Sequence, residues 1–233
     1  MSELFLETKN NMGYQANKLD PISEAYVHQA VSDSNGNYID IGAAYGVATS
    51  EILKEREATV YCNDICSEHL EELSHDSRVK CIYGDFMTAD IPEAFFDGAL
   101  CSRLLHFYGK DKAISTLKAI SHCLKQGGKL FLTTETPFLG NWKAYLKIFH
   151  QKKQSGEKWP GYVDNVYEIE STGRSGILPN NMHFFDIDTL VYALNESGFS
   201  VDRVEYINRS NTFPDDLLLD GRESVGAIAR KIR

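Results

Sequence analysis

A short turn of small residues follows a hydrophobic stretch and reads Asp40-Ile-Gly42-Ala-Ala44-Tyr-Gly46. Small residues let a ligand approach the backbone, and glycine readily takes positive φ angles. A dinucleotide-binding fingerprint would need Gly at positions 42, 44 and 47, but the chain has Ala44 and Val47 at two of them. A phosphate-binding loop would need Gly-Lys-Ser or Gly-Lys-Thr, which the turn lacks. The turn therefore predicts a ligand site that holds neither a nicotinamide or flavin dinucleotide nor a nucleoside triphosphate.

This turn belongs to a chain in which strand patterns alternate with helical patterns. We expect strands at residues 38–41, 59–63, 79–83, 98–102 and 129–134, and helices at 47–55, 67–74 and 110–124. Gly127-Gly128 is expected to end the last of these helices in a left-handed turn. After residue 185 the alternation resumes with a helix at 186–197 and strands at 199–206 and 224–229, the last two able to pair antiparallel.

Strands separated by helices imply right-handed crossovers and a mainly parallel sheet that is covered on both faces. The sequence thus predicts an α/β fold with a doubly wound, mainly parallel seven-stranded sheet whose last strand is antiparallel. We divide this single domain into an N-terminal helical cap at 1–35, a cofactor-binding core at 36–136, an inserted lid at 137–185 and a completion of the core sheet at 186–233. The cap is expected because Ile22, Tyr26 and Ala30 share one helical face.

With this order of elements, the turn resembles the glycine motif of the class I, Rossmann-like S-adenosylmethionine-dependent methyltransferases of the small-molecule type. That motif has the form acid-x-Gly-x-Gly-x-Gly, which Asp40, Gly42 and Gly46 match, with Ala44 in place of the middle glycine. The resemblance covers residues 36–135 and resumes from 184 to the C-terminus. It implies a methyltransferase that uses S-adenosyl-L-methionine and releases S-adenosyl-L-homocysteine.

The resemblance also assigns roles to the residues that end the strands. It places Asp64 on the ribose hydroxyls, which suits a carboxylate because it offers several acceptor sites to two donors; the alternative is an N-cap of the next helix, a role that Ser67 could take. It places Asp85 on the adenine amino group with Phe86 along the ring, the alternative being a solvated turn acid beside a core aromatic. The cofactor-binding residues are then Asp40, Gly42, Ala44, Tyr45, Gly46, Asp64, Ile65, Asp85, Phe86, Ser102 and Arg103.

Methyl transfer from a sulfonium is an in-line displacement, so the enzyme mainly orients the nucleophile and excludes water. Neither a metal nor a covalent intermediate is required. A hydroxyl or protonated amine as acceptor would need a base, for which histidine is the usual residue near neutral pH. His106, after the fourth core strand, is the first candidate and His183 the second, with a packing role as the alternative for each. Tyr45 could face the sulfonium with its ring.

The insertion at 137–185 is rich in aromatic residues, as a lid over an organic substrate would be. The alternative is a small helical subdomain with its own core, because Trp142, Tyr145 and Phe149 fall on one helical face. Six Lys and Arg against four Asp and Glu in this segment favour an acidic substrate. The predicted substrate-binding residues are Tyr14, Trp142, Tyr145 and Phe184, and the helix that carries Tyr26 and His28 is expected to close the pocket.

Composition excludes several other classes. A net charge of -9 disfavours nucleic acid as a partner. The sequence shows neither a signal peptide nor a hydrophobic run of membrane-spanning length, so we expect a cytoplasmic protein without membrane contact. Five cysteines fit reduced thiols. Cys62, Cys66 and His69 have part of a zinc-site spacing, but no second ligand cluster follows, and we expect no metal.

The sequence therefore predicts an S-adenosylmethionine-dependent methyltransferase that acts on oxygen, or on nitrogen, of a small organic molecule. Two alternatives stay open: a protein-modifying methyltransferase whose insertion docks a polypeptide, and a catalytically silent cofactor-binding partner of another enzyme. The sequence does not distinguish a monomer from a homodimer.

Overall fold

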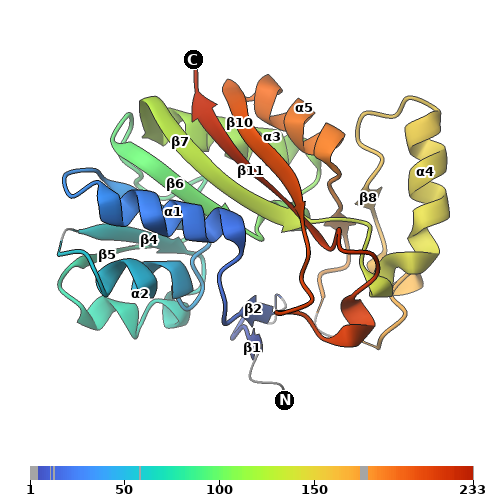
Figure 1. Ribbon diagram of the computed structural model, residues 1–233, viewed down its shortest axis with the longest axis horizontal. Coiled ribbons are helices and arrows are strands. Elements are labelled where there is room, and N and C mark those ends of the chain that lie inside the picture. The colour runs from blue at the N-terminus through green and yellow to red at the C-terminus, as the bar shows by residue number, and fades with distance from the viewer. Residues whose placement is uncertain (1–4, 11, 13, 58, 174–177, 233) are drawn as a thin grey trace.

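The computed structural model describes residues 5–10, 12, 14–57, 59–173 and 178–232. Its centre is a seven-stranded sheet in the order β10-β11-β7-β6-β3-β4-β5 (Figure 1). The strands are β3 (Tyr38–Ile41), β4 (Val60–Asp64), β5 (Val79–Tyr83), β6 (Phe96–Ser102), β7 (Leu124–Glu135), β10 (Phe199–Ile207) and β11 (Ser224–Lys231). β3 pairs in parallel with β4 and β6, whereas β11 runs antiparallel to both β7 and β10. The predicted fold class is confirmed, with β11 placed inside the sheet and β10 at its edge.

Helices cover both faces of this sheet (Figure 1). On one face lie α1 (Pro21–Ser32) and α2 (Val47–Leu53), and on the other lie α3 (Lys110–Cys123) and α5 (Ile187–Glu196). Successive side chains of β3 point to opposite faces of the sheet, so Tyr38 packs with the α1 cluster and Ile39 with the α3 cluster. The strand order reverses beside β3, so the carboxyl ends of β3, β4 and β6 frame the expected binding cleft.

The α1 helix reaches the cavity discussed below with its first turn, where Ser23 and the N-cap Asp20 form part of the wall. Its Tyr26 is fully buried against the sheet, with ring centroids 5.9 Å from Tyr38 and 5.6 Å from Phe131. Neither Tyr26 nor His28 is among the described residues that line the cavity discussed below. The hairpin of β1 (Phe5–Glu7) and β2 (Tyr14–Ala16), with its connection, also lines the cavity.

Two other expectations differ from the structure. Residues 67–74 do not form one α-helix but two short 3-10 turns, η1 (Ser67–His69) and η2 (Leu73–His75). Gly127-Gly128 does not end α3, because the chain becomes extended at Leu124 and enters β7 directly. Gly127, with φ +77°, lies inside β7, near a register shift of the pairing with β6. The glycine pair therefore shapes the strand rather than the helix end.

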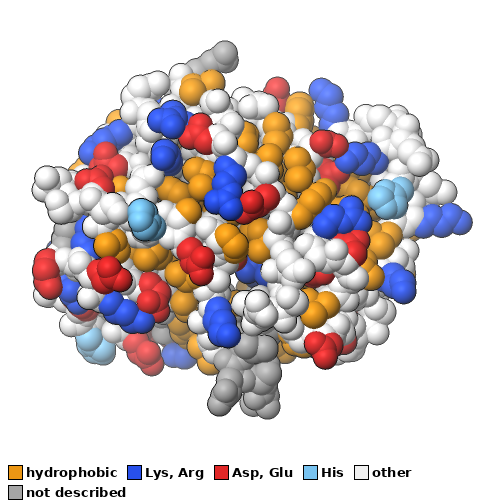
Figure 2. Space-filling model, in the orientation of Figure 1, with side chains coloured by type: hydrophobic (Ala, Val, Ile, Leu, Met, Phe, Trp, Pro, Cys, Tyr) orange, Lys and Arg blue, Asp and Glu red, His pale blue; other side chains and the backbone are white. Residues whose placement is uncertain are grey.

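The insertion forms a helical unit beside the sheet with a core of its own (Figure 1). It contains η4 (Gly140–Tyr145), α4 (Leu146–Gln154), β8 (Tyr162–Val163), η5 (Val166–Glu168) and β9 (Met182–His183). Its core joins Trp142, Tyr145 and Phe149 with Phe213 from the connection between β10 and β11, which also holds η7 (Asp215–Leu217). Figure 2 shows Lys and Arg side chains around this end of the molecule, where α4 carries Lys147, Lys152 and Lys153. Among the described residues, no helix is long and apolar enough to cross a membrane.

Candidate active site

A cavity of about 510 Å³ opens at the carboxyl ends of β3, β4 and β6. Its walls come from the N-terminal hairpin, the glycine turn, the ends of the strands, the insertion and the β10–β11 connection. Nine of the eleven predicted cofactor residues line it: Asp40, Gly42, Ala44, Asp64, Ile65, Asp85, Phe86, Ser102 and Arg103. His106, Tyr14 and Trp142 line it as well, whereas Tyr45, Gly46, His183, Tyr145 and Phe184 are not among the described lining residues.

The glycine turn takes a left-handed backbone at three positions. Gly42, Ala44 and Gly46 have φ of +66°, +45° and +62°. Such angles are unfavourable for a residue with a Cβ, so Ala44 occupies a strained position where the resemblance expects glycine. At Gly46 a Cβ would meet Leu73 Cδ1 at 2.2 Å, which makes this glycine a requirement of packing.

Asp64, at the end of β4, is buried and holds the glycine turn in place. Its Oδ2 accepts the N–H of Ala44 at 2.8 Å, and its Oδ1 accepts the N–H of Cys66 at 2.8 Å. The N-cap of η1 is Cys66, so Asp64 does not cap that turn. Each carboxylate oxygen has two lone pairs, so Asp64 retains acceptor capacity toward the cavity that it lines.

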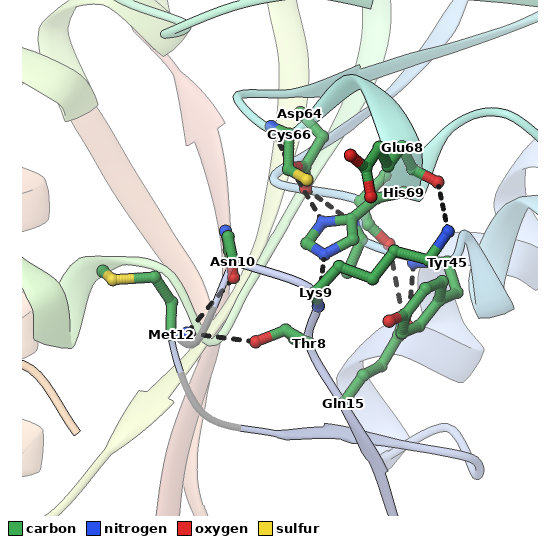
Figure 3. A network of polar contacts seen from close by, with 12 residues as sticks. Thr8, Lys9, Asn10, Met12, Gln15, Tyr45, Asp64, Cys66, Glu68 and His69 are labelled. Atoms are coloured by element: carbon green, nitrogen blue, oxygen red, sulfur yellow. Dashed lines mark hydrogen bonds and ion pairs between the residues drawn. The ribbon is translucent and has the colours of Figure 1, made fainter. Parts of the chain in front are cut away.

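The third partner of Asp64 is His69, whose Nδ1 lies 3.1 Å from Asp64 Oδ1 (Figure 3). His69 Nε2 accepts the backbone N–H of Lys9 at 3.1 Å. Because Nε2 accepts this bond, the proton of the neutral ring resides on Nδ1, which donates to Asp64. The sequence pointed to His69 only as a metal ligand; its actual contacts span 60 residues of chain and leave no local signal. Among the described residues, no group of three His, Cys, Asp or Glu side chains could hold a metal ion.

Gln15 and Tyr45 join the N-terminal hairpin to the glycine turn (Figure 3). The backbone N–H of Tyr45 donates to Gln15 Oε1 at 2.9 Å, and Gln15 Nε2 donates to the carbonyl oxygen of Ala43 at 3.3 Å. The Tyr45 hydroxyl donates to the carbonyl oxygen of Glu7 at 2.9 Å. Tyr45 is thus engaged with the hairpin rather than facing the cavity.

The remaining carboxylates at this end of the cavity differ in charge. Burial raises the pKa of Asp40 to about 7, and the neighbouring Asp64 carboxylate adds to the rise. The pKa of Asp85 is lowered, first by the N–H of Met87 that donates to it and then by Lys112, whose Nζ lies 3.3 Å from Asp85 Oδ2. Asp85 is therefore a charged acceptor, and it lies beside the buried ring of Phe86.

Arg103 follows β6 in a left-handed conformation, with φ +56°. Its N–H donates to the carbonyl oxygen of Thr133 at 2.8 Å, and its Nη2 donates to Glu135 Oε1 at 2.5 Å. Burial alone would raise the pKa of Glu135, but Arg103, His106 and Trp142 together outweigh burial and hold that pKa below its usual value. Glu135, Asn141 and Arg209 line the cavity although the sequence did not single them out.

The two candidate bases have different surroundings. His106 is buried, lines the cavity, and its Nδ1 has no hydrogen-bond partner among the described residues. Burial lowers its pKa to about 4, so its ring is neutral at neutral pH. His183 is fully buried, packs against Trp159 and Phe185, and donates from Nδ1 to the carbonyl oxygen of Tyr108 at 3.2 Å. The structure therefore does not bring His183 to the cavity.

Two of the predicted substrate residues belong to the core of the insertion. The Tyr145 hydroxyl donates to the carbonyl oxygen of Pro160 at 2.6 Å, and Phe184 is fully buried beside Trp142, with centroids 4.9 Å apart. They support the wall of the cavity, whereas Tyr14 and Trp142 form part of its surface.

The fold defines a Rossmann-like α/β protein with a cavity at the carboxyl ends of its parallel strands. Residues 39–128 match the model of a family described as a methyltransferase domain. The residues that match lie on the strands and turns that frame the cofactor end of the cavity, so this part of the chain has the sequence features of a methyltransferase domain. No curated protein matches the chain in sequence.

Solved structures share the fold over nearly the whole chain. A S-adenosylmethionine-dependent methyltransferase from Methanosarcina mazei has a TM-score of 0.64 and 20% identity over 92% of this chain and 99% of its own. One from Mesorhizobium loti has a TM-score of 0.61 and 19% identity over 90% and 98%. The 1,6-didemethyltoxoflavin-N1-methyltransferase of Burkholderia thailandensis, solved with its substrate and S-adenosylhomocysteine, has a TM-score of 0.58 and 18% identity over 90% and 80%.

Proposed function

We propose that the chain transfers the methyl group of S-adenosylmethionine to an oxygen or nitrogen atom of a small organic molecule. One observation carries the proposal: a single cavity extends from the strand-end carboxylates Asp64 and Asp85 to the aromatic wall of the insertion at Trp142. Its volume of about 510 Å³ lies in the range of small-molecule sites. The Burkholderia neighbour, which is solved with bound 1,6-didemethyltoxoflavin, supports this class of acceptor.

The cofactor end of the cavity fits S-adenosylmethionine in its donor and acceptor groups. Asp64 Oδ2, which accepts one hydrogen bond in the structure, has acceptor capacity left for a ribose hydroxyl, and charged Asp85 for the adenine amino group, with Phe86 along the ring. The small residues Gly42 and Ala44 leave room for the ligand beside the backbone. When bound, the cofactor supplies an electrophilic methyl group.

The other end of the cavity would hold the acceptor. We assign His106 as the base because it lines the cavity, is neutral at neutral pH and has a ring nitrogen without a partner among the described residues. The insertion at 137–185 would serve as the lid that excludes water, with Trp142 facing the acceptor. Tyr14 would close the cavity from the N-terminal side.

Isothermal titration of the purified chain with S-adenosylmethionine and with S-adenosylhomocysteine tests the proposal. Micromolar binding of both is expected, and Asp64→Ala should raise both Kd values at least about tenfold, or 1.4 kcal/mol. Asp90→Ala, at an exposed site, is the matched control. Binding of neither ligand would refute the proposal.

Turnover with a panel of small phenols, carboxylates and amines tests the second half of the proposal. Methylation by the isolated chain would remove the catalytically silent alternative. His106→Ala should abolish turnover while the Kd for S-adenosylhomocysteine stays within about twofold of the original. A fully active His106→Ala enzyme would show that His106 is not the base.

A further inference from the structure

Buried polar side-chain atoms without a hydrogen-bond partner collect at the acceptor end of the cavity. Of the residues that line the cavity and are described, four carry such an atom: Arg103 Nη1, His106 Nδ1, Asn141 Oδ1 and Trp142 Nε1. They come from two separate segments, residues 103–106 after the end of β6, and η4 of the insertion. A buried polar atom left without a partner costs about 1–3 kcal/mol, so four in one place indicate groups that a ligand completes.

Two of these atoms are donors by their chemistry. Arg103 already gives Nη2 to Glu135, which leaves Nη1 available. The indole N–H of Trp142 lies near Glu135 and lowers the pKa of that carboxyl through a weak side-chain hydrogen-bonding interaction, but Nε1 has no partner at full hydrogen-bond geometry among the described residues. Guanidinium and indole N–H groups both require acceptors, and for a guanidinium the strongest acceptor is a carboxylate. A ligand oxygen that accepts hydrogen bonds would therefore complete this site.

A second buried arginine lies beside the first. Arg209 is 2% exposed and lines the cavity, with Nη2 3.1 Å from Asp20 Oδ2 and Nε donating to Ser224 Oγ. The Cζ atoms of Arg103 and Arg209 lie 5.0 Å and 5.4 Å from the centroid of the same Phe213 ring. Burial lowers the pKa of Arg209, and the Arg103 cation acts in the same direction.

Each arginine has one carboxylate partner, so the four charged groups sum to zero. Arg103 Nη1 nevertheless has no partner among the described residues after Glu135 accepts from Nη2, and Arg209 places a second buried guanidinium beside the same ring. The surrounding lining is apolar, formed by Leu139, Leu178, Met182 and Leu217. The environment therefore suits an oxygen anion attached to an apolar body.

We propose that Arg103, Arg209 and Trp142 bind a carboxylate of the methyl-accepting molecule, so that the acceptor is a small organic acid with an apolar body. This inference rests on the proposed function, because it takes this end of the cavity to be the acceptor site. Asn141 Oδ1 and His106 Nδ1 then remain to accept a hydrogen bond from a hydroxyl or amine on the same molecule.

Matched acid and amide pairs test the proposal. The probes are benzoate and benzamide, salicylate and salicylamide, indole-3-acetate and indole-3-acetamide, and hexanoate and hexanamide. Their binding to the chain is measured by calorimetry in the presence and absence of saturating S-adenosylhomocysteine. At least one acid should bind about tenfold more tightly than its amide, a difference of 1.4 kcal/mol. Equal or absent binding of acids and amides throughout the panel would overturn the proposal.

Two variants locate the preference within the site. Arg103→Gln removes the guanidinium, and Trp142→Phe removes only the indole N–H; each should reduce the acid preference at least threefold. Arg203→Gln, on the exposed side of β10, is the control and should leave the preference unchanged. Retained affinity for S-adenosylhomocysteine shows that a variant is folded. An acid preference that survives both substitutions would contradict the assignment.

The cofactor also contains a carboxylate, and the same variants separate the two sources. If Arg103→Gln weakens S-adenosylhomocysteine tenfold and leaves the acid preference intact, the guanidinium serves the cofactor and the proposal is wrong. Failure of the proposed function has a different signature, because S-adenosylhomocysteine would then not bind to the unmodified chain at all. The acid and amide pairs would still be compared without it.

Discussion

At the scale of single residues, His69 connects the N-terminal segment to the Asp64 carboxylate in the wall of the cavity. Its Nδ1 faces Asp64 at 3.1 Å and its Nε2 accepts the Lys9 N–H at 3.1 Å. Both bonds exist together only when the ring is neutral, because a protonated Nε2 would face the Lys9 donor with a second proton. The ring therefore couples the position of Asp64 to the docking of the segment that carries Lys9.

Substitutions at His69 should separate these two contacts. His69→Asn can keep a donor near Asp64 but cannot reach Lys9, so the affinity for S-adenosylhomocysteine should fall by no more than about threefold. His69→Ala loses both contacts, and its Kd should rise about tenfold. Limited proteolysis at Lys9 should accelerate in both variants. His75→Asn, at an exposed site, is the control, and equal Kd values for the unmodified chain and the two His69 variants would contradict this role.

Asp40 provides a prediction about pH. Its pKa is raised to about 7 in the fold from 3.8, first by burial and then by Asp64. Because the folded protein holds this proton more tightly, the stability that the protonated carboxyl contributes is present below pH 3.8 and is lost as the pH rises through 7. The Asp40→Asn variant cannot ionise at this position and does not lose this stability. The difference in unfolding free energy between the variant and the unmodified chain should therefore shift by about 2 kcal/mol in favour of the variant as the pH rises from 5.5 to 8.5.

Urea unfolding without cofactor at these two pH values measures the effect. The control is Asp90→Asn, at an exposed site. Its unfolding free energy should change between the two pH values by the same amount as that of the unmodified chain. The variant retains Thr49, whose Oγ1 lies 3.5 Å from Asp40 Oδ2, and three buried groups whose pKa values the Asp40 carboxylate raises, namely Tyr26, Cys62 and Cys101. If the unfolding free energy of Asp40→Asn changed with pH by the same amount as that of the unmodified chain, ionisation of Asp40 would not destabilise the fold.

At the scale of elements, the strands and the longer helices were predictable, and the short elements were not. The core strands are short hydrophobic runs, and the helices α3 and α5 show helical periodicity, so local pattern and final burial agree. The β1–β2 hairpin pairs only three residues and is held by Gln15 and Tyr45 through tertiary bonds. No local pattern specifies such contacts.

The candidate site was predictable where the order of strands determines it, and unpredictable where tertiary packing determines it. Residues at the ends of parallel strands, such as Asp64 and Asp85, could be assigned because the fold itself brings strand ends together. His106 and His183 were indistinguishable in sequence, since only tertiary packing decides which ring reaches the cavity. Glu135 and Arg209 were not predicted from the sequence, because their partners are distant in the chain. Arg103 lies 32 residues from Glu135, and Asp20 lies 189 residues from Arg209.

The glycine turn gives a prediction for the contact between two elements. Gly46→Ala would place a Cβ 2.2 Å from Leu73 Cδ1 in η2, at φ +62°. Gly127→Ala has a similar φ of +77° and nothing within 4 Å, so it measures the backbone cost alone. We expect Gly127→Ala to cost about 1 kcal/mol of unfolding free energy and Gly46→Ala at least about 2 kcal/mol. Equal costs in urea unfolding would show that Leu73 adjusts freely.

At the scale of the whole molecule, one buried ion pair joins the beginning of the fold to its end. Asp20 caps α1 by accepting the N–H groups of Ile22 and Ser23 through Oδ1, and its Oδ2 lies 3.1 Å from Nη2 of Arg209. Both side chains are at least 95% buried. A charge left alone at such a site is costly, whereas loss of both charges is tolerated far better.

A double-mutant cycle should therefore be strongly non-additive. Asp20→Asn keeps an oxygen that can cap α1 but leaves the Arg209 cation buried without its carboxylate, which should cost about 3–5 kcal/mol of unfolding free energy. Arg209→Met removes that cation, so the double variant should be more stable than Asp20→Asn alone, with a coupling energy of at least about 2 kcal/mol. Urea unfolding of the four proteins measures this coupling. Additive costs would mean that the two ends of the chain are stabilised independently, and that the pair does not hold α1 against the β10–β11 connection.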